Sequence, residues 1–241
     1  MWKTIWEPGV ESIPDRIDLD GKGYRLRKIF KQDFFATTAL YENGSDRIVL
    51  KRSRNQAFCR IPMAWMGRWL TGHEITIYRR LENVSGIPAL RANPDPYTLI
   101  HEYIEGQPLD PRLPVGDRFF DDLAELLDTL HTNKVVYVDA NKADNIVVGR
   151  DGRPYLIDFQ ISFLADPSHS DRWGIVEKIF QRLRKEDFYH FLKHKNRCRP
   201  DLMTPGEKKR RYHRSGLIRL HRLLTRNLIT IRRSILKKSI L

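Results

Sequence analysis

The sequence predicts an α+β chain in two parts, a small antiparallel β-rich N-terminal part followed by a mainly helical C-terminal part. Three observations lead to this fold class. β-like runs separated by turn residues occupy 24–52, amphipathic helical patterns follow at 63–81 and 118–131, and Glu-Gly-Gln-Pro at 105–108 breaks the chain between the two parts. The 241 residues with 41% hydrophobic content suffice for a real core, and a single domain made of both parts fits this length as well as two separate domains do.

Three consecutive β-like runs near the N-terminus predict an antiparallel meander. They follow a loop-like start that ends at Gly21-Lys22-Gly23, and short polar segments join them. The predicted strands are residues 24–30, 34–41 and 47–52. Strands joined by such short connections pair with their neighbours, so we expect a small sheet here.

The segment 63–81 has a helical period. Within it Glu74, Tyr78 and Leu81 fall at i, i+4 and i+7, which places a carboxylate on an otherwise apolar face. Another strand is predicted at 97–103.

The helical part begins with an amphipathic segment at 118–131. Its apolar face consists of Leu123, Leu126, Leu127 and Leu130, and His131 is predicted to cap the helix end. The two short β-like runs at 146–148 and 155–157 flank an Asp-Gly turn, which predicts a hairpin.

The formal net charge of +13 is concentrated at one end of the chain. Residues 172–241 contain 21 Lys and Arg against 5 Asp and Glu, a net of +16, whereas residues 1–171 have a net of −3. In the last segment, 206–241, Leu and Ile recur at steps of three or four, with Arg and Lys largely opposite. Such a helix is typical of an element that binds an anionic membrane surface, here through 208–241. Binding to nucleic acid and packing on the core are the alternatives.

The two cysteines, Cys59 and Cys198, belong to no Cys or His cluster. They give no support for a disulfide framework or a structural zinc site, and they indicate a reducing, cytoplasmic compartment. No apolar stretch approaches the roughly 20 residues of a membrane span, so any membrane contact is expected at the surface.

Polar residues interrupt the apolar, β-like sequence between 135 and 159. They are Asp139, Asn141, Asp144, Asn145 and Asp158. A carboxylate in apolar surroundings needs a partner or a cation, because an unpaired buried charge is costly. The hairpin returns Asp158 towards Asn145, and their oxygen atoms suit Mg²⁺, which commonly holds a substrate phosphate as well.

From about residue 26 to 179 the sequence resembles the protein-kinase-like fold. The run 137–147 resembles the catalytic loop, and 156–160 resembles the metal-binding D-F-G segment with glutamine in place of glycine. Lys51 resembles the phosphate-binding lysine, and Glu74 resembles its ion-pair partner on a helix. The order of all these motifs matches that of the family.

This resemblance implies an ATP-dependent phosphotransferase that uses ATP and Mg²⁺. The implied roles are catalysis for Asp139, Lys51 and Glu74, metal binding for Asn145 and Asp158, and nucleotide contact at the hinge for Lys51, Glu102, Tyr103 and Ile104. The sequence leaves Asp144 open as an alternative to Asp139 for the base. Phosphoryl transfer asks the protein mainly to neutralise phosphate charge and align the acceptor, and these residue types meet that need.

The catalytic loop departs from the family pattern in two ways. Five residues separate Asp139 from Asn145, where the family has four. Tyr137 and Val138 stand where the family has His and Arg, so control through a phosphorylated activation loop is not expected.

Two other regions depart as well. The stretch 31–37 replaces the glycine-rich loop and contains no glycine, and only twelve residues separate Asp158 from Asp171. That segment is short for a platform that holds a peptide. The resemblance implies that Asp171 begins the next helix of the fold and braces the catalytic loop.

In these departures the sequence resembles the lipopolysaccharide-core (Kdo/heptose) kinases and related atypical serine/threonine kinases. On that resemblance the acceptor is a sugar hydroxyl on a lipid-linked glycan such as lipopolysaccharide core, met at the cytoplasmic face of the inner membrane. A protein serine/threonine kinase is the enzymatic alternative, and a kinase-like scaffold acting through its basic tail is the non-enzymatic one.

The predicted organisation is a single domain, 1–241, with N-lobe 1–103, C-lobe 104–205 and tail 206–241.

Overall fold

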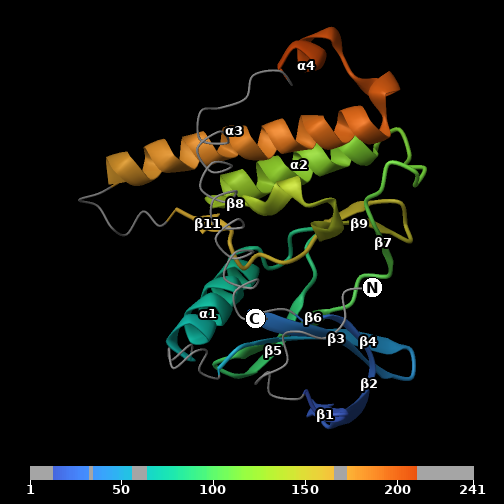
Figure 1. Ribbon diagram of the computed structural model, residues 1–241, viewed down its shortest axis with the longest axis vertical. Helices are drawn as coiled ribbons and strands as arrows, with labels where there is room; N and C mark the ends of the chain where they lie inside the picture. Colours follow the sequence, from blue (N-terminus) through green and yellow to red (C-terminus); the bar gives the residue numbers. More distant parts are fainter. Residues whose placement is uncertain (1–12, 33–34, 56–63, 166–172, 211–241) are drawn as a thin grey trace, which may run out of the picture.

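The computed structural model describes residues 13–32, 35–55, 64–165 and 173–210, which form two lobes (Figure 1). One lobe is a six-stranded sheet with a helix, α1, beside it, and the other is mainly helical. The predicted α+β, two-lobed architecture is confirmed.

The sheet of the first lobe is antiparallel throughout, in the order β1-β2-β3-β4-β6-β5. Its strands are β1 Arg16–Leu19, β2 Lys22–Gln32, β3 Ala36–Asn43, β4 Asp46–Ser53, β5 Leu90–Asp95 and β6 Thr98–Glu102. The meander β2-β3-β4 and the strand β6 are those predicted from the sequence. The two edge strands, β1 and β5, were not predicted. β1 has only four residues, and β5 contains Asn93-Pro94, which an edge strand tolerates because one side needs no ladder hydrogen bonds.

Helix α1, Ala64–Arg80, packs against this sheet with its predicted face inward. Glu74 and Tyr78 are buried there, and Leu81 follows directly after the helix. Gly67 allows the close approach, because a Cβ at this position would lie 2.1 Å from the carbonyl oxygen of Arg54.

The second lobe is built on α2 and α3, which lie alongside each other (Figure 1). Its helices are α2 Phe119–Thr132, α3 Trp173–Cys198 and α4 Pro205–Arg210. The four predicted leucines of α2 are all buried. The predicted hairpin is formed by β9 Ile146–Gly149 and β10 Pro154–Leu156, and its turn uses Gly152 at φ 78°.

Three short strands complete the second lobe. β7, Gly106–Pro108, lies within the predicted break and pairs with β9, while β8 Val135–Val136 pairs with β11 Phe163–Leu164. The catalytic-loop sequence therefore lies between β8 and β9, and the D-F-Q segment lies between β10 and β11.

A single hydrophobic core joins the lobes. It contains Tyr78 and Leu81 from the α1 side, Leu99 from β6 and the leucine face of α2, and Phe159 lies within it. The residues beside Phe159 are thereby held at the junction of the lobes.

The predicted basic amphipathic segment beyond residue 210 lies outside the described residues, as do Cys59 and Asp171. Among the helices that the structure describes, none has the length and apolar character needed to cross a bilayer.

Candidate active site

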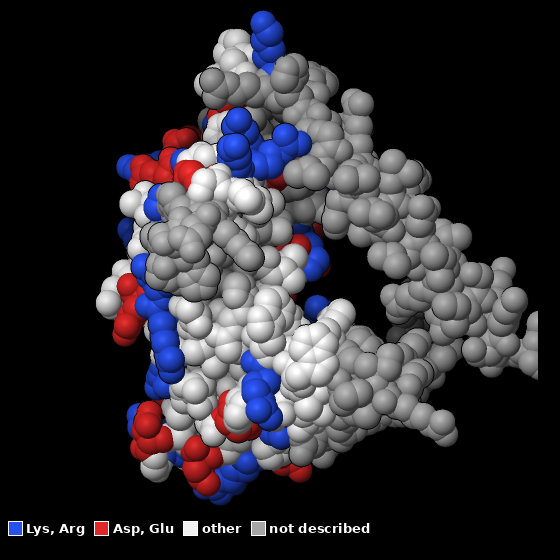
Figure 2. Space-filling model, turned by 90° about the vertical axis from the view of Figure 1, so that its left-hand side faces the viewer, with Lys and Arg blue, Asp and Glu red and all other residues white. Residues whose placement is uncertain are grey.

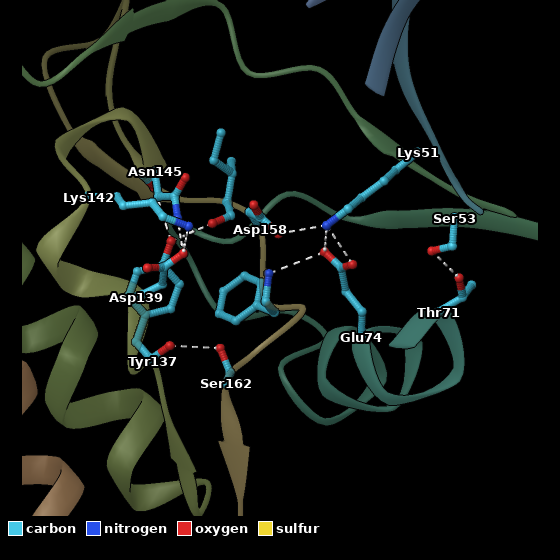
Figure 3. A network of polar contacts seen from close by, with 12 residues as sticks. Lys51, Ser53, Thr71, Glu74, Tyr137, Asp139, Lys142, Asn145, Asp158 and Ser162 are labelled. Carbon is cyan, nitrogen blue, oxygen red and sulfur yellow. Dashed lines mark hydrogen bonds and ion pairs between the residues drawn. The ribbon is translucent and has the colours of Figure 1, made fainter. Parts of the chain in front are cut away.

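The junction of the lobes contains an ion-pair centre formed by Lys51, Glu74 and Asp158 (Figure 3). Lys51 Nζ lies 2.8 Å from Glu74 Oε2 and 2.6 Å from Asp158 Oδ1. Lys51 and Glu74 are almost fully buried, with side-chain exposures of 8% and 2%. Three residues predicted from distant parts of the sequence are thus brought into direct contact.

Two side-chain contacts join strand β4 to helix α1, and together they set the position of Glu74. Lys51 and Ser53 lie on the same face of β4, and Thr71 and Glu74 lie one turn apart on α1. Besides the Lys51–Glu74 pair, Thr71 Oγ1 is 2.8 Å from Ser53 Oγ (Figure 3). The glutamate is therefore pre-positioned to orient the lysine.

The charges of this centre are set by burial and by one another. Burial alone would lower the pKa of Lys51, but Glu74 and Asp158 outweigh it and raise that pKa, so the ammonium is kept charged. Burial likewise disfavours the charged form of Asp158, yet the charge of Lys51 prevails and lowers the pKa of that carboxyl. Burial raises the pKa of Glu74, and Lys51 opposes this shift.

The backbone around Asp158 is held in an uncommon conformation. Asp158 has φ 64°, which non-glycine residues rarely adopt. The next residue, Phe159, is fully buried, and its N–H donates to Glu74 Oε1 at 3.2 Å. On the other side, the Tyr137 hydroxyl donates to the carbonyl of Ile157. These contacts turn the Asp158 carboxylate towards Lys51.

The catalytic-loop sequence brings Asp139, Lys142 and Asn145 together (Figure 3). Asp139 Oδ2 accepts hydrogen bonds from Asn145 Nδ2 at 3.0 Å and from Lys142 Nζ at 2.5 Å. Asp139 and Asn145 are buried, whereas Asp144 is exposed. The additional residue of this loop is accommodated by two successive 3₁₀ turns, Asp139–Asn141 and Ala143–Asn145.

Helix α3 holds the catalytic loop through a buried residue that was not predicted from the sequence. The carboxylate of Asp187, fully buried, accepts the N–H groups of Tyr137 and Val138, both at 2.8 Å. His131 Nε2 lies 3.1 Å from the same carboxylate, so this histidine is a buried partner of Asp187. Asp187, which lies along the helix among aromatic residues, thus braces the catalytic loop, while Asp171, from which a brace was expected, lies outside the described residues.

Two more residues of α3 contact the loop beside Asp139. His194 Nε2 donates to the carbonyl of Ala140 at 2.9 Å, and Lys193 Nζ donates to Asn141 Oδ1 at 2.6 Å. In the sequence of α3, polar residues recur among aromatic ones. From the sequence alone, polar residues that contact the catalytic loop cannot be distinguished from polar residues on a solvent-exposed face.

The predicted hinge residues connect the two lobes. Glu102 is the last residue of β6; its N–H donates to the carbonyl of Ala89, and its own carbonyl is 2.7 Å from Nδ1 of the buried His101. Tyr103 stacks on Phe30 of β2, with ring centroids 6.1 Å apart. For Ile104, the described part of the chain provides no hydrogen-bond partner for the backbone N–H or C=O.

The donor set at this site fits Mg²⁺. No group of three or more His, Cys, Asp or Glu side chains capable of holding a metal occurs among the residues that the structure describes. Mg²⁺ does not require one, since it is commonly bound by one or two protein groups, with phosphate and water completing its shell. Asn145 donates through Nδ2, which leaves Oδ1 available, and Asp158 uses only Oδ1 in its contact with Lys51. One amide oxygen and one carboxylate oxygen therefore remain for a cation.

Comparison with known proteins establishes the fold. No protein-family model and no curated protein sequence matches the chain. Among solved structures, the chain is similar to the Rio2 kinase of Chaetomium thermophilum, in its ADP/Mg²⁺–phosphoaspartate complex, with 16% sequence identity and a TM-score of 0.53. The match covers 77% of this chain and only 60% of that one. The two-lobed architecture described above is accordingly a protein-kinase-like fold.

Proposed function

We propose that this protein is an ATP-dependent phosphotransferase that moves the γ-phosphate of ATP to a hydroxyl group. The observation that carries the proposal is the buried Lys51, held by Glu74 at 2.8 Å and by Asp158 at 2.6 Å, on a kinase-like fold. A buried lysine with two carboxylates is costly to build for stability alone. The same arrangement has a function when nucleotide phosphates and a cation bind at the site, because the lysine neutralises phosphate charge and a carboxylate binds the cation.

The proposed roles follow from the chemistry of each group. Lys51 neutralises phosphate charge and Glu74 orients it. Asp158 and Asn145 would hold Mg²⁺, which supplies further neutralisation of the phosphates. Asp139 is the proposed base, because it is buried beside Asn145 and Lys142, whereas Asp144 is exposed.

The hinge supports the nucleotide assignment. The backbone N–H and C=O of Ile104 have no partner among the described residues, and such groups match the edge of a nucleobase. We assign nucleotide contact to Glu102, Tyr103 and Ile104 together with Lys51. The Rio2 structure contains ADP and Mg²⁺, which supports ATP and Mg²⁺ as the cofactors.

For the acceptor we propose a sugar hydroxyl on a lipid-linked glycan, met at the cytoplasmic face of the membrane. Two observations support a small or extended acceptor rather than a peptide. Only residues 159–172 separate Asp158 from α3, and Val138 stands where an arginine would otherwise bind a phosphorylated activation loop. A protein serine or threonine hydroxyl is the alternative acceptor.

The reaction class is tested by ATP binding with and without Mg²⁺, followed by turnover of the wild type, Asp158→Ala and Asp144→Asn. We expect Mg²⁺-dependent binding and turnover in the wild type, loss of both in Asp158→Ala, and near-normal turnover in Asp144→Asn. If the wild type shows neither Mg²⁺-dependent binding nor turnover, the protein is a kinase-like scaffold and the proposal fails.

The acceptor is tested separately, by comparing phosphate incorporation into extracted glycolipid with incorporation into a generic protein substrate. Preference for the glycolipid supports the sugar acceptor, and preference for the protein replaces it with the serine/threonine alternative. Asp139→Asn serves as the inactive control in both arms.

A further inference from the structure

One side of the molecule exposes large apolar side chains in an ordered arrangement. On α1, Trp65 and Trp69 are 66% and 61% exposed, and on α3, Ile175 is 64% exposed with Ile179 one turn further along. In the segment after Asp158, Ile161 is 53% exposed. We call these five residues the apolar strip. Side chains of this size so far out of the core mark an interaction surface when they gather on one side.

The strip is continuous with the candidate active site. Trp69 stacks on His73 with ring centroids 5.6 Å apart, and His73 Nε2 lies 2.7 Å from the carbonyl of Ser162. This contact fixes α1 against the chain that follows Asp158, in which Ile161 precedes Ser162. In Figure 1, α1, β11 and the first turns of α3 all lie on this side.

Both helices combine apolar and basic residues in the same pattern. Trp65, Arg68 and Trp69 fall at i, i+3 and i+4 on α1, and Ile175, Lys178 and Ile179 repeat this spacing on α3. Neither helix has an acidic residue in its first turn. Figure 2 looks onto this side and shows Lys and Arg side chains beside an area of uncharged residues, with Asp and Glu side chains farther towards one edge.

The combination of apolar and basic side chains distinguishes among three possible partners of this surface: the C-terminal segment of the chain, a second copy of the protein and a lipid bilayer. Residues 206–241 of this chain contain 12 Lys and Arg against 1 Glu, so their charge would be repelled by Arg68 and Lys178. A second copy related by a two-fold axis would likewise place basic residues against basic residues. An anionic lipid surface complements both features, because tryptophan prefers the boundary between acyl chains and headgroups and cations bind the headgroups.

We propose that the apolar strip, with Arg68 and Lys178 beside it, docks the protein on an anionic phospholipid bilayer. The tryptophan rings and Ile161 enter the headgroup region, and the basic side chains contact lipid phosphates. Because Ile161 is three residues from Asp158, docking places the candidate active site next to the bilayer. The apolar strip contains no residue of the segment 206–241, and its membrane contact does not depend on the proposed enzymatic activity.

The test uses the full chain with vesicles of phosphatidylcholine mixed with phosphatidylglycerol, against vesicles of phosphatidylcholine alone. We expect co-sedimentation with the mixed vesicles, quenching of tryptophan fluorescence by acyl-brominated lipid, and weakening of both at high salt. The double variant Trp65→Ser/Trp69→Ser is expected to lose about tenfold in vesicle affinity. Ile29→Ser/Phe188→Ser, which removes two exposed apolar residues outside the strip, serves as the matched control and should bind like the wild type.

A second double variant and a measurement of thermal unfolding show whether a loss of binding is caused by misfolding. Ile175→Ser/Ile179→Ser changes only the α3 half of the strip and should also weaken binding, while thermal unfolding verifies that each variant is folded. The proposal is overturned if the wild type does not bind the mixed vesicles, or if folded strip variants bind as tightly as the wild type, since the tail then carries the membrane contact. Concentration-dependent dimerisation that disappears in the strip variants would instead assign the surface to a second copy.

Discussion

Lys51 Nζ and Asp158 Oδ1 lie 2.6 Å apart, although 107 residues separate them in the sequence. The pair joins β4 of the first lobe to the segment that follows β10 of the second. In the proposed function, a nucleotide phosphate and its cation would share these two groups, which already hold each other in place.

Substitution of Lys51 tests this centre. Lys51→Met leaves two neighbouring carboxylates, Glu74 and Asp158, without their cation, so we expect a loss of about 3 kcal/mol in the free energy of unfolding. Phosphoryl transfer should fall by roughly a hundredfold or more, because phosphate charge is no longer neutralised. Denaturant unfolding and ATP turnover measure the two effects. Lys22→Met, an exposed strand lysine, is the control; equal effects in both variants would contradict a special role for Lys51.

The two candidate bases are separated by a pair of matched substitutions. Asp139→Asn keeps the size of a side chain that accepts from Asn145 and Lys142, but it removes the charge, and turnover should fall by about 10² to 10⁴. Asp144→Asn changes an exposed residue and should retain near-normal turnover. The measurement is the initial rate at saturating Mg²⁺ and ATP. A larger loss in Asp144→Asn would transfer the role to that residue.

The core of the first lobe could be predicted from the sequence because it leaves local signals, whereas the pairing of Lys51 with Glu74 was expected from the resemblance to the protein-kinase-like fold. A strand shows alternation, a turn shows Asp-Gly or Asn-Gly, and Glu74 stood out as a carboxylate on an apolar helix face. The edge strands could not be predicted, since β1 has only four residues and β5 contains a proline. Edge strands depend on pairing with a neighbour more than on their own pattern.

The contacts of α3 with the catalytic loop could not be predicted for a different reason. Asp187 lies 50 residues from Tyr137, and it is polar within a helix of mixed charge. Its burial becomes evident only when α3 packs against the loop. Asp171 was expected in this role only from the resemblance to the protein-kinase-like fold, in which an aspartate at the start of the next helix braces the catalytic loop.

Asp187 is expected to be essential for the conformation of the catalytic loop. Asp187→Ala leaves the buried N–H groups of Tyr137 and Val138 without partners, which should cost about 2 to 4 kcal/mol in the free energy of unfolding. Asp128→Ala, an exposed residue of α2 that contacts the same His131 only at 4.0 Å, should change stability by less than about 0.5 kcal/mol. Hydrogen exchange at the two amides provides a local readout. Protection that persists in the Asp187→Ala variant would show that another group satisfies them.

The stability of the fold should also depend on pH through His101. Burial lowers the pKa of this histidine from 6.5 to about 4, and the neighbouring charge of Lys51 acts in the same direction, although the hydrogen bond to the Glu102 carbonyl opposes it. Between these values the unfolded chain binds a proton that the folded chain does not, so the free energy of unfolding falls as the pH is lowered from 6.5 to about 4. The contribution of this one group reaches about 3 kcal/mol at the lower limit.

Denaturant unfolding of the wild type and His101→Phe across this range measures the effect. Phenylalanine preserves the stacking on Tyr78, whose ring centroid lies 5.5 Å from that of His101, but it does not titrate. The variant should therefore be less dependent on pH, with a residual slope from His190, whose pKa burial also lowers to about 4. Asp158 acts in a lower window: its depressed pKa makes its contribution complete above the ordinary aspartate value, and that contribution is lost only at still lower pH. An identical slope in the variant and the wild type between pH 6.5 and 4 would mean that His101 is protonated in the folded state and that the ring does not lie in the buried position beside Lys51.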